Sequence, residues 1–250
     1  MSPDHQKERV TSLEVALGTT LFFLAFLSPV INSLDGLSML AVTESLVRHG
    51  SVAVPKSLGI PGVGGLYYSW WYPLLSVIAA PFVICGFALA RLSHLPPHFV
   101  AAAFASVLPA VLIGVTTGLV VRIAARLGAG GRASVIAAIA FAFGIALVYA
   151  REFMADPLLA LVTAAAIYFE LGPPRELPLI GLCTALAVLA KPTGIVVGPV
   201  IAIHAVLVGK SARAFWTPVI STVIGLAIYF VYNDIRFGNA LSFGPPGHFL

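Results

Sequence analysis

The chain has 250 residues, of which 59% are hydrophobic and only 10% are charged, and its mean hydropathy is +1.00. A soluble globular protein is about 45–50% apolar and about 25% charged. This composition therefore excludes an ordinary soluble domain and predicts an all-α polytopic membrane protein, embedded in lipid. The net charge of +4 bears on membrane topology, so no nucleic-acid partner is expected.

The first membrane helix is expected over residues 13–33. The polar segment 1–12 before it carries Lys7 and Arg9, and basic residues before a first helix favour a cytoplasmic N-terminus. The apolar run lacks a small-residue cleavage site and is long enough to span a bilayer. We therefore expect it to stay in the protein as a membrane helix that runs outward, and not to be removed as a signal peptide.

A polar-to-mixed segment follows and begins with a short amphipathic helix, expected over 36–49. Its apolar residues recur mostly on a helical period, and Gly50 provides a stop signal. A Gly/Pro-rich loop is expected over 59–65. These features predict an extracytoplasmic loop with a helix lying at the membrane surface.

Five aromatic residues occupy six positions over 67–72. Aromatic clusters of this kind are enriched at the headgroup level of membranes, which is their simplest interpretation. The alternative is that Tyr67, Tyr68 and Trp71 line a groove for a lipid or a sugar.

The later apolar runs set the topology. If all of them span, the basic loop 122–132 falls outside, against the positive-inside rule. The run 74–90 follows the aromatic cluster and contains Pro81, so we expect it to be an interfacial or re-entrant helix on the outer side, packed on protein. Seven crossings then remain: 13–33, 99–121, 133–150, 157–171, 177–190, 195–208 and 214–232. Two of them, 157–171 and 177–190, are short and need tilt or a thin bilayer.

This map divides the charged residues between two sides. The inner side holds Lys7, Arg9, Arg122, Arg126, Arg132, Arg175, Lys210 and Arg213. The outer side holds Asp35, Glu44, Arg48, Lys56, Arg91, Arg151, Glu152, Asp156, Lys191, Asp234 and Arg236. Charges at a membrane edge are costly and usually face a cavity, a partner or a ligand. We therefore expect an extracytoplasmic cleft that contains Asp35, Asp156, Lys191 and Arg236.

Short motifs distributed from Leu34 to Asn239 support a family resemblance. They are Leu34-Asp35-Gly36, Trp71-Tyr72-Pro73-Leu74-Leu75, Arg122-Ile123-Ala124-Ala125-Arg126-Leu127-Gly128, Tyr149-Ala150-Arg151 with Asp156-Pro157-Leu158, Leu189-Ala190-Lys191-Pro192-Thr193-Gly194, and Tyr232-Asn233 with Arg236-Phe237-Gly238-Asn239. In this order the chain resembles the GT-C membrane glycosyltransferases, especially the branch of protein O-mannosyltransferases and lipid A aminoarabinose transferases.

The resemblance implies transfer of a sugar from a polyprenyl-phosphate donor to a lipid, glycan or protein acceptor, outside the membrane and with inversion. Asp35 and Asp156 are the candidate catalytic residues. Asp35 is the candidate general base, since a carboxylate can take the proton of a weak acceptor nucleophile. Lys191, Arg236 and Arg151 are candidates for the donor phosphate, whose charge needs fixed cations. A divalent ion such as Mg²⁺ or Mn²⁺ would need carboxylates, namely Asp35 and Asp156.

Each of these residues also has a structural interpretation. Asp35 and Asp156 suit helix N-caps, and Glu152 suits an ion pair with Arg151. Lys191 could extend to the interface, and Arg236 could bind headgroups.

Two other functions are open at the level of the whole chain. Relatives in the resembled family usually continue beyond the position that corresponds to Leu250, so residues 1–250 are expected to form one module that lacks their C-terminal part. An inactive scaffold is therefore one alternative. A transporter is the other, although transporters usually show repeated halves with paired broken helices. The expected location is the cell (inner) membrane.

Overall fold

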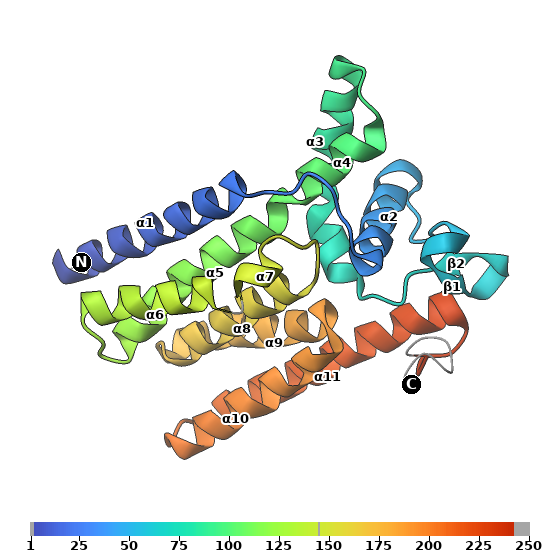
Figure 1. The fold of residues 1–250 in the computed structure, drawn as a ribbon. Coiled ribbons are helices and arrows are strands. Elements are labelled where there is room, and N and C mark those ends of the chain that lie inside the picture. Colours follow the sequence, from blue (N-terminus) through green and yellow to red (C-terminus); the bar gives the residue numbers. More distant parts are fainter. Residues whose placement is uncertain (1–2, 145, 243–250) are drawn as a thin grey trace.

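The computed structural model describes residues 3–144 and 146–242, with side chains from Thr11 onward. The described residues form an all-α protein with one two-stranded antiparallel piece, in which Ile60 pairs with Tyr68 and Pro61 with Tyr67 (Figure 1). The α-helices are α1 (Pro3–Ala25), α2 (Leu34–His49), α3 (Pro73–Ser93), α4 (Pro97–Ala105), α5 (Val107–Arg126), α6 (Gly131–Phe143), α7 (Ala146–Tyr149), α8 (Asp156–Glu170), α9 (Leu177–Ala190), α10 (Val197–Leu207) and α11 (Ala212–Phe237). The short elements are η1 (Lys56–Leu58), β1 (Ile60–Pro61), η2 (Val63–Gly65), β2 (Tyr67–Tyr68), η3 (Pro174–Glu176) and η4 (Pro192–Val196).

Three helical segments in the described chain are long and apolar enough to cross a membrane. They are Pro73–Ser93, Pro97–Arg126 and Ala212–Phe237. Many large apolar side chains on these and other helices are exposed, as expected where lipid is the solvent. The fold is therefore that of a membrane protein, as its composition predicts.

Several predicted crossings are short helices. The predicted crossings 157–171, 177–190 and 195–208 correspond to α8, α9 and α10, which have 15, 14 and 11 residues. A straight helix needs about 20 residues to span the hydrocarbon core. The number of crossings therefore stays a prediction.

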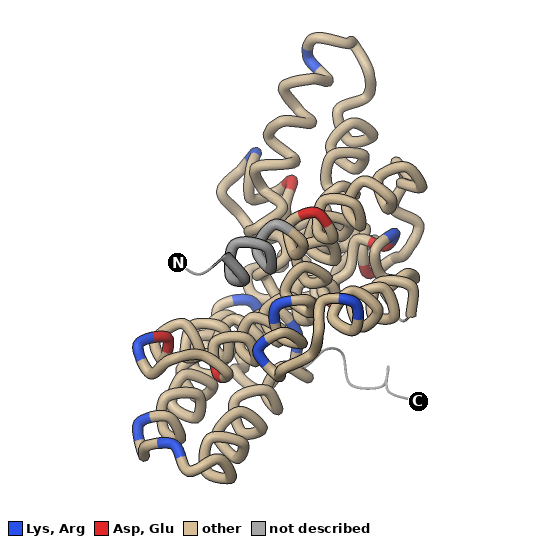
Figure 2. The backbone as a smooth tube through the Cα atoms, turned by 90° about the vertical axis from the view of Figure 1, so that its left-hand side faces the viewer, with Lys and Arg blue, Asp and Glu red and all other residues tan. Residues whose placement is uncertain are grey.

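The segment expected to be re-entrant forms a long helix. α3 is continuous through Pro81 over 21 residues and is long enough to cross a membrane. It packs on α4 after a tight connection at His94, and Figures 1 and 2 show this hairpin projecting beyond the other helices. A helix of this length is longer than a short re-entrant turn, so the prediction of an interfacial or re-entrant helix is not confirmed.

The predicted amphipathic helix is α2, which begins two residues earlier than expected and ends at Gly50, where φ is 61°. Positive φ is a conformation that glycine adopts without strain. Met39 and Leu40 are buried and belong to a core cluster that also contains Leu75 of α3. The apolar face of α2 therefore packs largely on protein.

Glycines allow close packing between the helices. In α5, a Cβ at Gly114 would overlap the Thr20 hydroxyl and lie 2.8 Å from the Ala16 carbonyl oxygen, and a Cβ at Gly118 would lie 2.9 Å from the Ser12 carbonyl oxygen. This small-xxx-small spacing brings helix backbones together, which is the main way that helices associate in lipid. Gly114 lies near Thr20 and Gly118 near Ser12, so α1 and α5 are antiparallel.

The charged residues lie mostly at the helix ends and in the loops (Figure 2). At one end of the bundle, an ion pair between Asp156 and Lys191 joins the start of α8 to the end of α9. At the other end, an ion pair between Arg126 and Glu176 joins the end of α5 to η3. We call these the Asp156 end and the Glu176 end.

Candidate functional site

Asp156 and Lys191 form an ion pair at the Asp156 end. Lys191 Nζ lies 2.6 Å from Asp156 Oδ1, and each side chain is about a quarter exposed, at 26% and 25%. α9 ends before Lys191 because Pro192 follows it, and the residue before proline favours extended backbone. Two of the predicted site residues, 35 positions apart, are therefore in contact.

Asp156 does not act as an N-cap. It is the first residue of α8, the preceding Ala155 is the cap position, and no side chain caps the helix. The carboxylate therefore interacts with the Lys191 ammonium instead, and with the positive end of the α8 dipole.

Asp35 lies in the first turn of α2 and is half-buried. It is not the N-cap either, because Ser33 has that role and its Oγ accepts a hydrogen bond from the Gly36 amide at 3.1 Å. Among the described residues, no hydrogen bond or ion pair involves the Asp35 carboxylate. This leaves the carboxylate at a helix N-terminus with acceptor sites available, as a general base requires.

Gly36 brings the start of α2 against the loop before α8. A Cβ at this position would lie 2.9 Å from the Phe153 carbonyl oxygen and 2.6 Å from Ile31. Only a glycine allows this approach. Asp35 is the neighbour of Gly36, and Asp156 follows Phe153 by three residues, so the segments that carry the two acids are packed together.

Arg151 is exposed and has no ion pair among the described residues. No ion pair joins Arg151 to Glu152, so the expected pair does not form. Near the Asp156 end, Arg151 is therefore a cation that has no counter-ion within the described part of the chain.

Arg236 is buried, with 1% of its surface exposed. Its Nη1 donates to the carbonyl oxygen of Ser69, and its Nη2 donates to Asn233 Oδ1 at 2.6 Å. Its Cζ lies 3.8 Å from the centre of the Tyr232 ring. The guanidinium thus attaches the end of α11 to the segment around Ser69, which the sequence predicts to be part of an extracytoplasmic loop. Its N–H donors bind groups inside the protein.

The predicted aromatic groove residues have different environments. Tyr68 is buried and packs edge-on against Phe237, with ring centres 6.0 Å apart. Tyr67 is partly exposed, with Lys56 Nζ 5.8 Å from its ring centre. Trp71 packs on the main core, and its buried Nε1 has no partner among the described residues.

The neighbouring Tyr72 stacks on Tyr229, with ring centres 4.0 Å apart. Burial, together with a hydrogen bond to Tyr229, raises the pKa of Tyr72 above its ordinary value. Its hydroxyl therefore stays neutral, and Tyr72 is a packing residue at the start of α3.

The described residues contain no cluster of three or more His, Cys, Asp or Glu side chains. Asp156 contacts a lysine and not a second carboxylate. A divalent ion held by Asp35 and Asp156 stays a prediction from the sequence.

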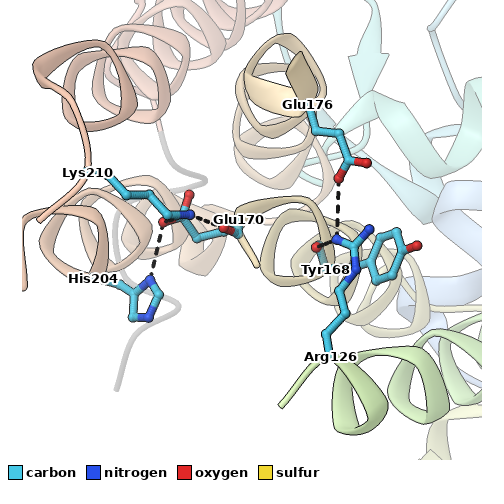
Figure 3. Close-up of polar contacts among 6 residues, drawn as sticks. All are labelled: Arg126, Tyr168, Glu170, Glu176, His204 and Lys210. Carbon is cyan, nitrogen blue, oxygen red and sulfur yellow. Dashed lines mark hydrogen bonds and ion pairs between the residues drawn. The ribbon is translucent and has the colours of Figure 1, made fainter. Parts of the chain in front are cut away.

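A second polar cluster lies at the Glu176 end, and the sequence did not reveal it (Figure 3). Glu170, at the end of α8, is only 2% exposed, and its Oε1 lies 2.9 Å from Lys210 Nζ and 3.2 Å from His204 Nδ1. Its Oε2 is buried without a hydrogen-bond partner among the described residues. The signal was present, because Glu170 is the single charged residue in the apolar run 157–171.

The Arg126 side chain lies at the same end of the bundle and contacts both α8 and η3. It donates to the Tyr168 carbonyl oxygen, its Nη1 lies 3.3 Å from Glu176 Oε2, and its Cζ lies 3.5 Å from the Tyr168 ring centre (Figure 3). These contacts connect helices and indicate a structural role.

Two hollows lie near this cluster. A cavity of about 180 Å³ is lined by Glu170, Lys210 and Ser211 together with apolar residues. An open groove of about 620 Å³ lies between the starts of α9 and α11. Pro174 and Leu177 line both, so the two hollows are neighbours.

Comparison of the chain with protein-family models and with curated proteins finds no match.

Proposed function

We propose that this chain is a membrane glycosyltransferase of GT-C type, which transfers a sugar from a polyprenyl-phosphate donor on the extracytoplasmic face. The observation that supports the proposal best is the Asp156–Lys191 ion pair, which follows the loop whose Phe153 carbonyl oxygen packs against Gly36, the neighbour of Asp35. The reaction needs a carboxylate that can take a proton, which Asp35 offers because it has no hydrogen-bond or ion-pair partner among the described residues, and it needs a cation held in place, which Lys191 offers.

The proposed reaction inverts the anomeric carbon. An acceptor hydroxyl or amine attacks that carbon and forms the new glycosidic bond. The bond from the carbon to the phosphate oxygen breaks, and the polyprenyl phosphate leaves with the bonding electrons. Asp35 takes the acceptor proton. The acceptor is a lipid, a glycan or a protein.

In this proposal Lys191 meets the leaving phosphate. Its ammonium is partly exposed, so a donor can reach it, and Asp156 holds it in place. Arg151 provides a second exposed cation. Arg236 acts indirectly, because its bonds to Ser69 and Asn233 fix the loop that carries Tyr67 and Tyr68.

The proposed topology has seven crossings and a cytoplasmic N-terminus in the cell membrane. The Asp156 end lies outside, together with α3 and the tip of the α3–α4 hairpin at His94. The arginine and lysine residues of the Glu176 end then lie in the cytoplasm, in agreement with the positive-inside rule.

The direct test is sugar transfer by the purified chain in liposomes that contain polyprenyl-phosphate sugars. Asp35→Asn should lower kcat by about 10²-fold or more, the range of general-base contributions. Asp234→Asn is the matched control, since Asp234 is an exposed acid in the last turn of α11, and it should leave transfer unchanged.

Equal transfer by wild type and Asp35→Asn would contradict the assignment of the base. Absence of transfer by the wild type with a panel of hexose and pentose donors would contradict the proposed activity and favour a scaffold.

A further inference from the structure

We propose that the Glu176 end binds one phospholipid, with its phosphate at Arg175 and Arg213 and its headgroup in the Glu170 cavity. The site lies at the opposite end of the bundle from Asp35 and Lys191, and it is independent of the proposed glycosyl transfer.

The groove between α9 and α11 has the chemistry of a lipid site. Arg175 and Arg213 are both exposed, and within the described part of the chain neither guanidinium has an ion-pair partner. Arginine forks match the geometry of phosphate oxygens. Two arginines that line one groove and have no counter-ion in the described chain therefore favour an anionic group in that groove.

The wall of the groove is apolar. Leu177, Pro178 and Ile220 line it, and Trp216 is 55% exposed at the same groove. Tryptophan is enriched at the level of lipid headgroups, where its ring is half apolar and its N–H is polar. An acyl chain fits this wall, whereas a free phosphate ion would leave it uncovered. These features favour a phospholipid as the occupant.

The neighbouring cavity specifies the headgroup. Glu170 Oε2 is a buried acceptor that lacks a donor among the described residues, and Glu170 lines the cavity. Lys210 already balances the carboxylate charge, so a neutral or a cationic donor can approach. The cavity volume of about 180 Å³ is well above the roughly 10–15 Å³ that a cavity needs to hold one water molecule. Ethanolamine and glycerol headgroups can donate a hydrogen bond there, and choline cannot.

The test is native mass spectrometry of the full chain released from detergent with equal amounts of phosphatidylethanolamine, phosphatidylglycerol and phosphatidylcholine. The wild type should retain one lipid. It should bind phosphatidylethanolamine and phosphatidylglycerol about tenfold more tightly than phosphatidylcholine, which corresponds to the free energy of one hydrogen bond to a charged group. Retention of phosphatidylcholine to the same extent would overturn the role of the Glu170 cavity.

The double variant Arg175→Gln/Arg213→Gln should reduce retention of phosphatidylethanolamine and phosphatidylglycerol by about tenfold or more, since each basic residue near a lipid phosphate contributes to binding. Arg132→Gln is the control, because Arg132 is an exposed arginine at the start of α6 and outside the groove. It should bind lipid as the wild type does.

Unchanged binding by the double variant, or an equal loss in Arg132→Gln, would overturn the site. Displacement of the lipid by millimolar inorganic phosphate would also overturn it, because it would show that only an anion is recognised. Circular dichroism of each variant separates these outcomes from misfolding.

Discussion

At the scale of single residues, the Asp156–Lys191 pair has both a structural and a functional role in our proposal. Both partners are about a quarter exposed, which places the pair between surface ion pairs, worth about 0–1 kcal/mol, and buried ones, whose disruption costs about 3–5 kcal/mol. Lys191→Met should therefore lower the free energy of unfolding by about 1–2 kcal/mol.

The measurement is unfolding in mixed detergent, with Asp156→Asn and the double variant completing a double-mutant cycle. A coupling energy near zero would show that the ion pair does not form in solution. If Lys191→Met lowers sugar transfer by more than the decrease in the folded fraction explains, Lys191 has a further role at the donor phosphate.

Arg236 provides a second prediction at this scale. Arg236→Met removes the donors for the Ser69 carbonyl oxygen and Asn233 Oδ1, and each unpaired buried acceptor costs about 1–3 kcal/mol. The free energy of unfolding should fall by about 2–4 kcal/mol. Arg236→Lys should have an intermediate effect, because an ammonium cannot reproduce the planar fork.

The control for Arg236 is Arg151→Met, in an exposed side chain without an ion-pair partner in the described chain. Its effect on stability should stay within about 0.5 kcal/mol. If Arg236→Met were equally neutral, the buried arrangement of Arg236 would be incorrect and a phosphate role would regain support.

At the scale of helices, glycine contacts should limit stability. Gly114→Leu places a side chain where Thr20 and the Ala16 carbonyl oxygen already lie. Overpacking of this kind costs about 1–3 kcal/mol, so the variant should melt at a lower temperature in detergent. Gly131→Leu is the control, since a Cβ there meets no atom within 4 Å. Equal melting temperatures for the two variants would contradict the packing of α1 on α5.

The same scale shows what the sequence could and could not predict. Counting helix directions predicted that Asp156 and Lys191 lie on the same side, because that count depends only on the order of apolar runs. Their direct contact was not predicted. The length of the helix over the run 74–90 was harder to predict, because Pro81 usually breaks a helix but lies inside the continuous helix α3.

The candidate site was also predicted unevenly. Asp35, Arg151 and Lys191 were proposed from the sequence because charges are rare in this chain. The burial of Arg236 and the Glu170 cluster were not, because they depend on which of several helix ends meet in space. Sequence spacing carries no information about such meetings between segments far apart in the chain.

At the scale of the whole molecule, the proposed topology predicts which positions a membrane-impermeant thiol reagent reaches. Single cysteines would be placed at 35, 94, 130 and 156, after replacement of Cys85 and Cys183 by alanine. Positions 35 and 156 should react from outside in intact cells, and position 130 only after permeabilisation, because it lies in the basic loop after α5.

Position 94 decides the role of the α3–α4 hairpin, whose tip it occupies. Labelling from outside would support seven crossings with the hairpin on the outer side. Labelling at 94 only after permeabilisation would show that α3 crosses the membrane, and the topology would then have to be revised.

The bond from Arg236 to the Ser69 carbonyl oxygen joins residues 167 positions apart, and this separation has a consequence for biosynthesis. At the usual elongation rates of about 5–20 residues per second, the ribosome needs roughly 8–33 seconds to make the chain between them. During that interval the strand segment β1–β2 has emerged without its final anchor. The last helix therefore completes a loop made early, and a protease or a chaperone has its best access to this region in that interval.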